Sequence, residues 1–120
     1  MKKKTIAIDL DGVIHAYSEG WNGGAMYDIP VKESHEALTN LVARGFRIAI
    51  VTARLNPKFP DMDKQRKAVE TWLLENKFIE GEHYHELTNN KPAAIAYIDD
   101  RAIAFENWEQ AVSDLQNLIP

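Results

Sequence analysis

The stretch from residue 5 to residue 13, TIAIDLDGV, constrains the fold of this chain more than any other stretch. It opens with a short apolar run rich in β-branched residues, which is typical of a buried strand. Asp9 and Asp11 follow where such a strand leaves its sheet, and Gly12 allows a sharp turn there because it has no Cβ. Ligands of open α/β sheets bind beyond the carboxyl ends of the strands. We therefore expect both acids at the mouth of a crevice, although Asp is also common in turns that bind nothing.

Two further apolar runs repeat this pattern. Residues 46–51 precede Thr52, and residues 94–98 precede the paired acids Asp99 and Asp100. Residues 30–45 begin with Pro, end with Gly and carry apolar residues at helical spacing, so they predict a helix between the first two strands. A strand, helix and strand of this kind form a right-handed parallel unit. The sequence therefore predicts three buried parallel strands whose polar ends meet at one edge of an α/β sheet.

The other segments complete one domain over residues 1–120. Residues 14–29 show neither a helical nor a strand period and predict a loop over the crevice. In this loop Trp21 or Asn22 contacts a substrate, or else Trp21 packs against the body of the domain. A helix capped by Asp61 or Asp63 is expected next, and a helix capped by Asn107 closes the chain after a short strand over 102–105. Their expected core faces are Val69, Trp72 and Leu73, and Trp108, Ala111, Val112, Leu115 and Leu118.

Composition narrows the class of protein. A hydrophobic fraction of 45% and a charged fraction of 27% are typical of a globular domain. The absence of cysteine excludes disulfides and zinc–cysteine sites. No segment reaches the length of a signal-peptide core or a membrane span, so we expect a cytoplasmic protein. The formal net charge of -4 disfavours a surface that coats nucleic acid, and clustered acids favour a bound divalent cation because they otherwise repel one another.

Two features have both an ordinary and a functional interpretation. His83 and His85 lie on an expected short strand over 83–87 and would point the same way, which is half of a metal site. Because no third ligand is near in sequence, we favour two exposed rings. Four basic residues form either a solvated helix face or a path for a phosphate-rich substrate. They are Lys58, Lys64, Arg66 and Lys67.

The residue types at the strand ends indicate phosphoryl chemistry. Mg²⁺ prefers one or two carboxylates together with waters and substrate phosphate. The hydroxyl of Thr52 and the ammonium of Lys91, which precedes the last strand, are groups that a phosphoryl group needs. A carboxylate can also serve as nucleophile and form an aspartyl-phosphate. A second carboxylate two residues later can protonate the leaving oxygen and then activate water.

Together these motifs resemble the haloacid dehalogenase (HAD) superfamily of phosphohydrolases over nearly the whole chain. Residues 9–13, 51–54, Lys91 and 98–101 look like its four motifs, in order. The resemblance implies a three-layer α/β/α, Rossmann-like parallel sheet with the first strand central. The intervals between the motifs are too short for a cap domain, so the chain looks like a capless member with an open site.

The resemblance also implies roles for the motif residues. Asp9 would attack phosphorus, and Asp11 would act as acid and base. The phosphate-binding residues would be Thr52, Arg54 and Lys91. The Mg²⁺ ligands would be Asp9, Asp11 through its backbone carbonyl, and Asp100, with Asp99 acting either through water or by contact with the direct ligands. Lys91 departs from the family pattern because only residues 92–94 separate it from the last strand.

The implied activity is hydrolysis of phosphomonoesters with Mg²⁺ as cofactor. Residues 52–72, together with 98–101 and Trp108, look similar to the 3′-phosphatase domain of polynucleotide kinase-phosphatases. This suggests as substrate a phosphorylated small molecule, a nucleotide or a nucleic-acid 3′-end. One alternative is a receiver-like signalling module, but a receiver carries its phosphorylated Asp on a later, central strand ahead of Thr and Lys. The other is a catalytically silent metal-binding interaction domain.

Overall fold

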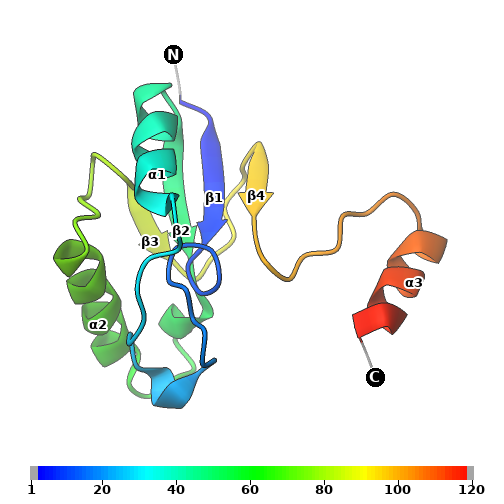
Figure 1. Ribbon diagram of the computed structural model, residues 1–120, viewed down its shortest axis with the longest axis horizontal. Coiled ribbons are helices and arrows are strands. Elements are labelled where there is room, and N and C mark those ends of the chain that lie inside the picture. Colours follow the sequence, from blue (N-terminus) through cyan, green and yellow to red (C-terminus); the bar gives the residue numbers. More distant parts are fainter. Residues whose placement is uncertain (1–2, 119–120) are drawn as a thin grey trace.

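The computed structural model describes residues 3–118, and at its centre lies a four-stranded parallel sheet (Figure 1). The strands follow the order β3 (Glu86–Thr88), β2 (Arg47–Val51), β1 (Thr5–Asp9) and β4 (Ala96–Ile98). All three pairings in this sheet are parallel. The expected parallel α/β fold class is therefore confirmed, with the first strand in the interior of the sheet.

The strand order reverses at β1. The chain proceeds from β1 through β2 to β3 in one direction and then returns to the other side of β1 to form β4. A reversal of this kind leaves a crevice beyond the carboxyl ends of the two strands that flank it. Asp9 is the last residue of β1, and Asp99 comes directly after β4. The topology therefore brings the predicted acids to the same crevice.

The core lies on one face of the sheet. Alternate residues of a strand share a face, and the isoleucines at alternate positions of β1 and β2 are at most 6% exposed. They form one apolar cluster with side chains of α1 (Ser34–Ala43) and α2 (Met62–Glu75). The isoleucines are Ile6, Ile8, Ile48 and Ile50, and the α2 members are Val69, Trp72 and Leu73, as expected.

The helix expected over residues 30–45 is shorter than its apolar pattern indicates. Pro30 pairs with His15 in an isolated antiparallel bridge, and Glu33 has a positive φ of 71°. Neither conformation continues a right-handed helix, so α1 begins only at Ser34. At the other end Gly45, with a φ of +94°, follows the helix as expected.

The segment between β1 and α1 forms the expected loop, and hydrogen bonds hold it in place. At its base the N–H of Val31 donates to the carbonyl of Ile14 (2.7 Å). The indole N–H of Trp72 donates to the carbonyl of Asp28 (2.9 Å), which ties the loop to α2. A short 3₁₀ turn, η1 (Asn22–Gly24), lies at the far end of the loop. These two contacts anchor the loop near its base.

The C-terminal helix departs from expectation. The N–H of Gln110 donates to the side chain of Asn107 (2.8 Å), so the expected cap is present at the start of α3 (Trp108–Leu118). Figure 1 shows α3 standing away from the sheet at the end of an extended segment. The expected strand over 102–105 does not form, so this segment is not paired to the sheet edge. The residues expected in the core, Trp108, Ala111, Val112, Leu115 and Leu118, are not buried.

The last strand is also less buried than its sequence predicts. The expected strand over 94–98 is reduced to β4, and all three of its residues are exposed. Within residues 3–118, β4 pairs with β1 alone and forms the edge of the sheet. An edge strand lacks one neighbour, so an apolar run there stays accessible. In this part of the chain no helix has both the length and the apolar character needed to cross a bilayer.

Candidate active site

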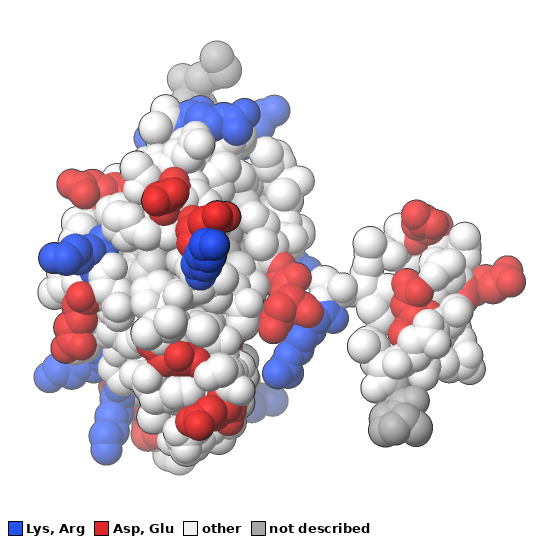
Figure 2. Space-filling view, viewed as in Figure 1, with Lys and Arg blue, Asp and Glu red and all other residues white. Residues whose placement is uncertain are grey.

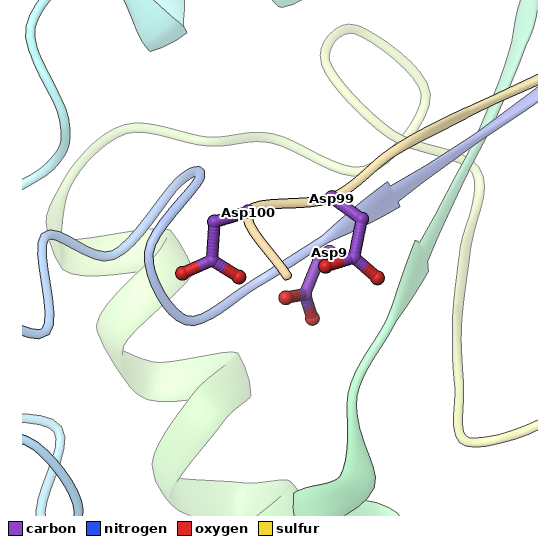
Figure 3. A group of neighbouring side chains, drawn as sticks. All are labelled: Asp9, Asp99 and Asp100. Atoms are coloured by element: carbon purple, nitrogen blue, oxygen red, sulfur yellow. The ribbon is translucent and has the colours of Figure 1, made fainter. Parts of the chain in front are cut away.

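Three carboxylates meet beyond the carboxyl ends of β1 and β4 (Figure 3). Asp9, Asp99 and Asp100 each offer one oxygen, and these oxygens lie within 4.8 Å of one another. The parallel register that aligns Ile8 with Ile98 also brings Asp9 beside Asp99. Carboxylate oxygens brought together in this way could hold a metal ion. Asp9 belongs to the first motif of the sequence, and Asp99 and Asp100 belong to the last, so the cluster joins two segments that are far apart in the chain.

The ionisation of Asp9 is strongly perturbed. Its pKa is raised from an ordinary value of 3.8 to about 7, and burial is the largest cause. The negative charges of Asp99, Asp100 and Asp11 contribute to this rise, whereas the backbone N–H of Leu10, which donates to Oδ1 (2.9 Å), opposes it. The cluster without a cation therefore contains repelling charges that a bound cation would offset.

Gly12 allows the loop after β1 to lie against the acidic cluster. Its φ is +86°, a conformation that side chains disfavour. A Cβ at this position would lie 2.1 Å from a carboxylate oxygen of Asp100. The sharp turn expected at Gly12 is confirmed, and the group that its backbone approaches is the side chain of Asp100.

The carboxylate of Asp11 belongs to a different cluster. Nε of Arg54 donates to its Oδ2 (2.9 Å), and Nη2 of Arg54 donates to its Oδ1 (3.2 Å). Nδ1 of His15 lies 2.8 Å from the same Oδ1. Pairing through two parallel N–H groups fixes both the position and the plane of a carboxylate. The side chain of Asp11 is thus held by a basic pair, apart from the three acids.

Arg54 is 1% exposed although it is charged. Besides its two contacts with Asp11, its Nη1 donates to the carbonyl of Gly24 (2.6 Å). The ring centroids of Trp21 and Tyr17 lie 5.0 Å and 5.8 Å from the guanidinium carbon. Three of its five N–H groups are therefore already used within the protein. The phosphate-binding role of Arg54 stays a prediction, and the contacts show that it orients Asp11.

His15 is a site residue that our sequence interpretation missed. It is fully buried, and its Nε2 accepts the backbone N–H of Asp28 (3.1 Å). Nδ1 must therefore carry the ring hydrogen, which it donates to Asp11. The rings of Tyr27 and Trp72 pack edge-to-face on the imidazole. The available sequence signal was a lone histidine four residues after Asp11, beside an apolar residue.

A cavity of about 420 Å³ opens beside the acids. Its polar lining consists of Asp9, Asp11, Thr52, Arg54 and Arg101, and its aromatic lining consists of Tyr17, Trp21 and Phe59. Thr52 is buried, and its Oγ1 accepts the backbone N–H of Arg54 (3.2 Å). The hydroxyl hydrogen of Thr52 is then free to donate to a ligand. The expectation that Thr52 lies near Asp9 and Asp11 is confirmed, whereas Asn22 does not line this cavity.

Lys91 lies apart from this cavity. Its Nζ is 4.3 Å from the ring centroid of Tyr97, which is on the sheet face opposite the isoleucines. There Lys91 lines a second cavity of about 90 Å³ together with Asp9 and Asp99. Asp9 thus borders both cavities, and Lys91 borders only the smaller one. Its predicted contact with phosphate stays a prediction.

Arg101 enters the larger cavity, although our sequence interpretation gave it no role of its own. Its backbone N–H donates to Oδ1 of Asp99 (2.8 Å), which holds the chain in a turn after β4. Its side chain is exposed and lines the cavity with Asp9 and Thr52. An exposed guanidinium at this place is a candidate phosphate ligand.

The two histidines of the 83–87 segment have structural contacts instead of a metal site. His83 is buried and not exposed as expected, and its Nδ1 accepts the N–H of Ile79 (2.9 Å). Nδ1 of His85 accepts the N–H of Ile48 (2.9 Å). Burial lowers the pKa of both rings. The strand lies at 86–88, beyond both histidines, and within residues 3–118 the three acids are the one group with metal-binding geometry.

The four basic residues do not form a continuous strip. Nη2 of Arg66 donates to the carbonyl of Leu87 (3.3 Å), so this side chain lies against the sheet. Lys64 and Lys67 are exposed on another side of α2, where both line a shallow cavity. Figure 2 shows basic and acidic side chains interspersed over the displayed face of the body. Arg66 is therefore separated from the exposed Lys64 and Lys67, and the path for a phosphate-rich substrate stays a prediction.

Comparisons of the chain with protein-family models, with curated proteins and with solved structures found no match. Its function therefore has to be inferred from the geometry of the site and from the motifs that supply it.

Proposed function

We propose that this protein is a Mg²⁺-dependent phosphomonoester hydrolase of the HAD type, with Asp9 as nucleophile. The observation that carries the proposal is the approach of Asp9, Asp99 and Asp100 to within 4.8 Å, beside the cavity that Thr52 and Asp11 line. Mg²⁺ would be held by Asp9, Asp100 and the backbone carbonyl of Asp11, with Asp99 acting through water. The bound cation would neutralise charge on the phosphoryl oxygens.

The proposed reaction has two steps. An oxygen of Asp9 forms a bond to phosphorus while the bond to the leaving oxygen breaks, and Asp11 donates a proton to that oxygen. Asp11 then accepts a proton from water as the water attacks the aspartyl-phosphate, which releases phosphate and restores Asp9. The contacts of Asp11 with Arg54 and His15 support the second of these steps, because they hold its carboxylate in one orientation as a proton acceptor.

The phosphoryl group would be held by the hydroxyl of Thr52 and by cations around the cavity. Arg101 supports this part of the proposal because its side chain is exposed in the cavity. Lys91 and Arg54 would contribute as the motifs imply. The substrate would be a phosphorylated small molecule, a nucleotide or a nucleic-acid 3′-end, because no inserted cap covers the cavity within the described residues.

The HAD-type proposal includes a capless three-layer α/β/α arrangement. In residues 3–118, α1 and α2 share a core with one face of the sheet, and α3 is not packed against it. The third layer would form when α3 covers the sheet. The apolar side chains that α3 exposes are the surface that would make this contact.

A phosphatase screen tests the proposal. We expect hydrolysis of p-nitrophenyl phosphate, sugar phosphates, nucleotides or a 3′-phosphorylated oligonucleotide only when Mg²⁺ is present. Asp9→Asn should reduce turnover by about a thousandfold or more, because the amide is not a nucleophile. Asp63→Asn makes the same chemical change on the exposed first turn of α2 and should leave turnover unchanged.

Equal phosphate release by wild type and Asp9→Asn would remove Asp9 from the reaction and overturn the proposal. Incorporation of one stable phosphate per chain without turnover would also overturn it, because this result identifies a receiver-like module. Mass spectrometry of the intact protein after exposure to a phosphate donor separates these outcomes.

A further inference from the structure

The larger cavity is lined by two chemically different sets of side chains. One set is polar and includes the acids and Thr52, and the other set consists of aromatic rings. Trp21 and Phe59 are 47% and 40% exposed, and their ring centroids lie 6.4 Å apart with 34° between the planes. Two large apolar side chains left exposed next to each other at the mouth of a polar site indicate a binding surface.

The ring of Trp21 is held in place. It lies 5.0 Å from the guanidinium carbon of Arg54, which also donates to the carbonyl of Gly24. Gly24 is buried with a φ of +82°, and a Cβ there would lie 3.1 Å from the Trp21 ring. The indole therefore packs against the backbone of Gly24 on one side. A fixed aromatic ring loses little conformational entropy when a ligand stacks on it.

Phe59 comes from a different segment and is positioned independently. Its N–H donates to the carbonyl of Asn56 (3.0 Å), and its own carbonyl accepts the N–H of Met62 at the start of α2 (3.2 Å). The backbone on both sides of Phe59 is thus fixed by turns. Trp21 from the first loop and Phe59 from the second form two walls of one opening.

Because the acids and the rings line the same cavity, the leaving group of a phosphomonoester bound at the acids can reach these rings. The same cavity contains Asp9, Thr52, Trp21 and Phe59, and its volume of about 420 Å³ suits a ligand larger than a phosphate ion. Aromatic side chains stack on the faces of nucleobases, and this contact tolerates any base because every base has a π-face.

We infer that the natural substrates are nucleotides whose base stacks on the exposed aromatic surface of Trp21 and Phe59; this inference rests on the proposed phosphatase activity. The mixed charges on the surface and the engagement of Arg66 with the sheet favour a single nucleotide over a long strand. The two rings select for an aromatic leaving group, and Thr52 with the acids engages the phosphoryl group.

A matched pair of substrates tests the contribution of the base. Ribose 5-phosphate and a nucleoside 5′-monophosphate present the same phosphoryl group on the same sugar and differ in the base. We expect kcat/KM to be about tenfold to a hundredfold higher for the nucleotide, mainly through a lower KM. Trp21→Ala and Phe59→Ala should each remove most of this preference, by lowering kcat/KM for the nucleotide more than for ribose 5-phosphate.

Three control variants separate stacking from structure. Trp21→Phe should retain most of the preference, because a smaller aromatic ring still stacks. Trp108→Ala removes an exposed indole from α3 and should leave kcat/KM for both substrates unchanged. Trp21→Ala also removes a contact of Arg54, whereas Phe59→Ala does not. A loss of preference in Phe59→Ala therefore reports on stacking and not on the position of Arg54.

Several outcomes would overturn the inference, and they differ from failure of the proposed function. Turnover of ribose 5-phosphate without preference for the nucleotide leaves the phosphatase intact and refutes the stacking role. Equal loss for both substrates in Phe59→Ala refutes it as well. If nothing is hydrolysed, the proposed function fails, and calorimetry with a nucleoside monophosphate still decides whether wild type binds it and Trp21→Ala does not.

A last comparison separates a single nucleotide from a strand. We expect a 3′-phosphorylated decanucleotide to be turned over no faster than a nucleoside 3′-monophosphate. A tenfold preference for the decanucleotide that disappears in the Lys64→Glu, Lys67→Glu double variant would identify a nucleic-acid end as the substrate and overturn the single-nucleotide assignment.

Discussion

β1 and β4 deliver the same kind of residue to the same crevice from very different surroundings. β1 pairs with a strand on each side, and its three middle residues are at most 6% exposed. β4 has β1 as its one neighbour in the described chain, and its residues are exposed. The acidic cluster therefore joins a well-packed part of the protein to a poorly packed one.

This difference shows that the three acids are unequal. Asp9 ends an interior strand, and burial is the largest cause of its raised pKa. Asp99 and Asp100 are exposed, and an extended segment without secondary structure follows them. Asp9 thus has a fixed position and an environment that disfavours its charge. The charges of Asp99 and Asp100 repel the charge of Asp9, and both residues belong to a part of the chain that makes few contacts.

The largest effect on stability should come from removing an apolar side chain on the packed side of this division, and the same change on the other side should have little effect. Leu73 on α2 is fully buried, and Leu115 on α3 is 48% exposed. Leu73→Ala should lower the free energy of unfolding by about 3 kcal/mol because it leaves a cavity in the core. Leu115→Ala should lower it by less than about 0.5 kcal/mol, as a surface substitution does. Urea denaturation measures both.

If Leu115→Ala were nearly as destabilising as Leu73→Ala, α3 would have to be packed in solution. That result would contradict the separation seen in Figure 1 and would favour the three-layer arrangement. Ala111→Gly on the same helix is not a suitable control, because glycine lowers helix stability by itself.

The next effect concerns the contact that links the two strands. In Gly12→Ala the new Cβ would lie 2.1 Å from a carboxylate oxygen of Asp100, so either the loop or the acid must move. We expect Mg²⁺-dependent turnover to fall by about a hundredfold, because shifts of about 1 Å in an active site have effects of this size. Gly20→Ala introduces the same kind of positive-φ strain, at +70°, with no atom within 4 Å. It should leave turnover close to that of wild type.

Comparable losses in both glycine variants would mean that backbone strain in the loop, and not the approach to Asp100, determines activity. Titration of Mg²⁺ against each variant adds a second measurement. Gly12→Ala should require more Mg²⁺ for half-maximal activity, and Gly20→Ala should not.

The packed part of the protein is also the part that the sequence predicts well. The runs before Asp9 and Thr52 are apolar because both strands lie inside the sheet, so the pattern and the burial agree. The apolar face of α3 is equally clear in the sequence. A helical period reports that one face is apolar, however, and it does not report what covers that face. This is why the expected burial of α3 is wrong.

The candidate site divides in the same way. Residues at strand ends could be predicted, because parallel strands deliver their ends to one edge. The contacts of Asp11 with Arg54 and His15 could not, since they depend on side-chain packing between segments 43 residues apart and on a loop without period. The aromatic walls at Trp21 and Phe59 depend likewise on how two loops meet.

The smallest effect we predict is a gain in stability from removing the charge of Asp9. Its pKa is raised from 3.8 to about 7 in the folded protein. Between pH 4 and pH 7 Asp9 therefore ionises more readily in the unfolded chain, which disfavours the folded state. The stability that Asp9 contributes is complete below pH 4 and is lost as the pH rises toward 7. Asp9→Asn retains an oxygen for the N–H of Leu10 and does not ionise. It should therefore stabilise the metal-free protein at pH 8 by about 2 kcal/mol, half of the full shift because Asp9 is only partly buried.

Denaturation in EDTA at pH 4, 6 and 8 measures this gain, which should be near zero at pH 4 and largest at pH 8. Asp99→Asn is the matched control from the exposed strand, and it should give a smaller gain because it removes only part of the repulsion on Asp9. Saturating Mg²⁺ should narrow the gap between wild type and Asp9→Asn, because the cation binds the folded wild type. If Asp99→Asn gave an equal gain in stability, the charge of Asp99 would be as unfavourable as the charge of Asp9. This result would refute the claim that the acids after β1 and β4 are unequal.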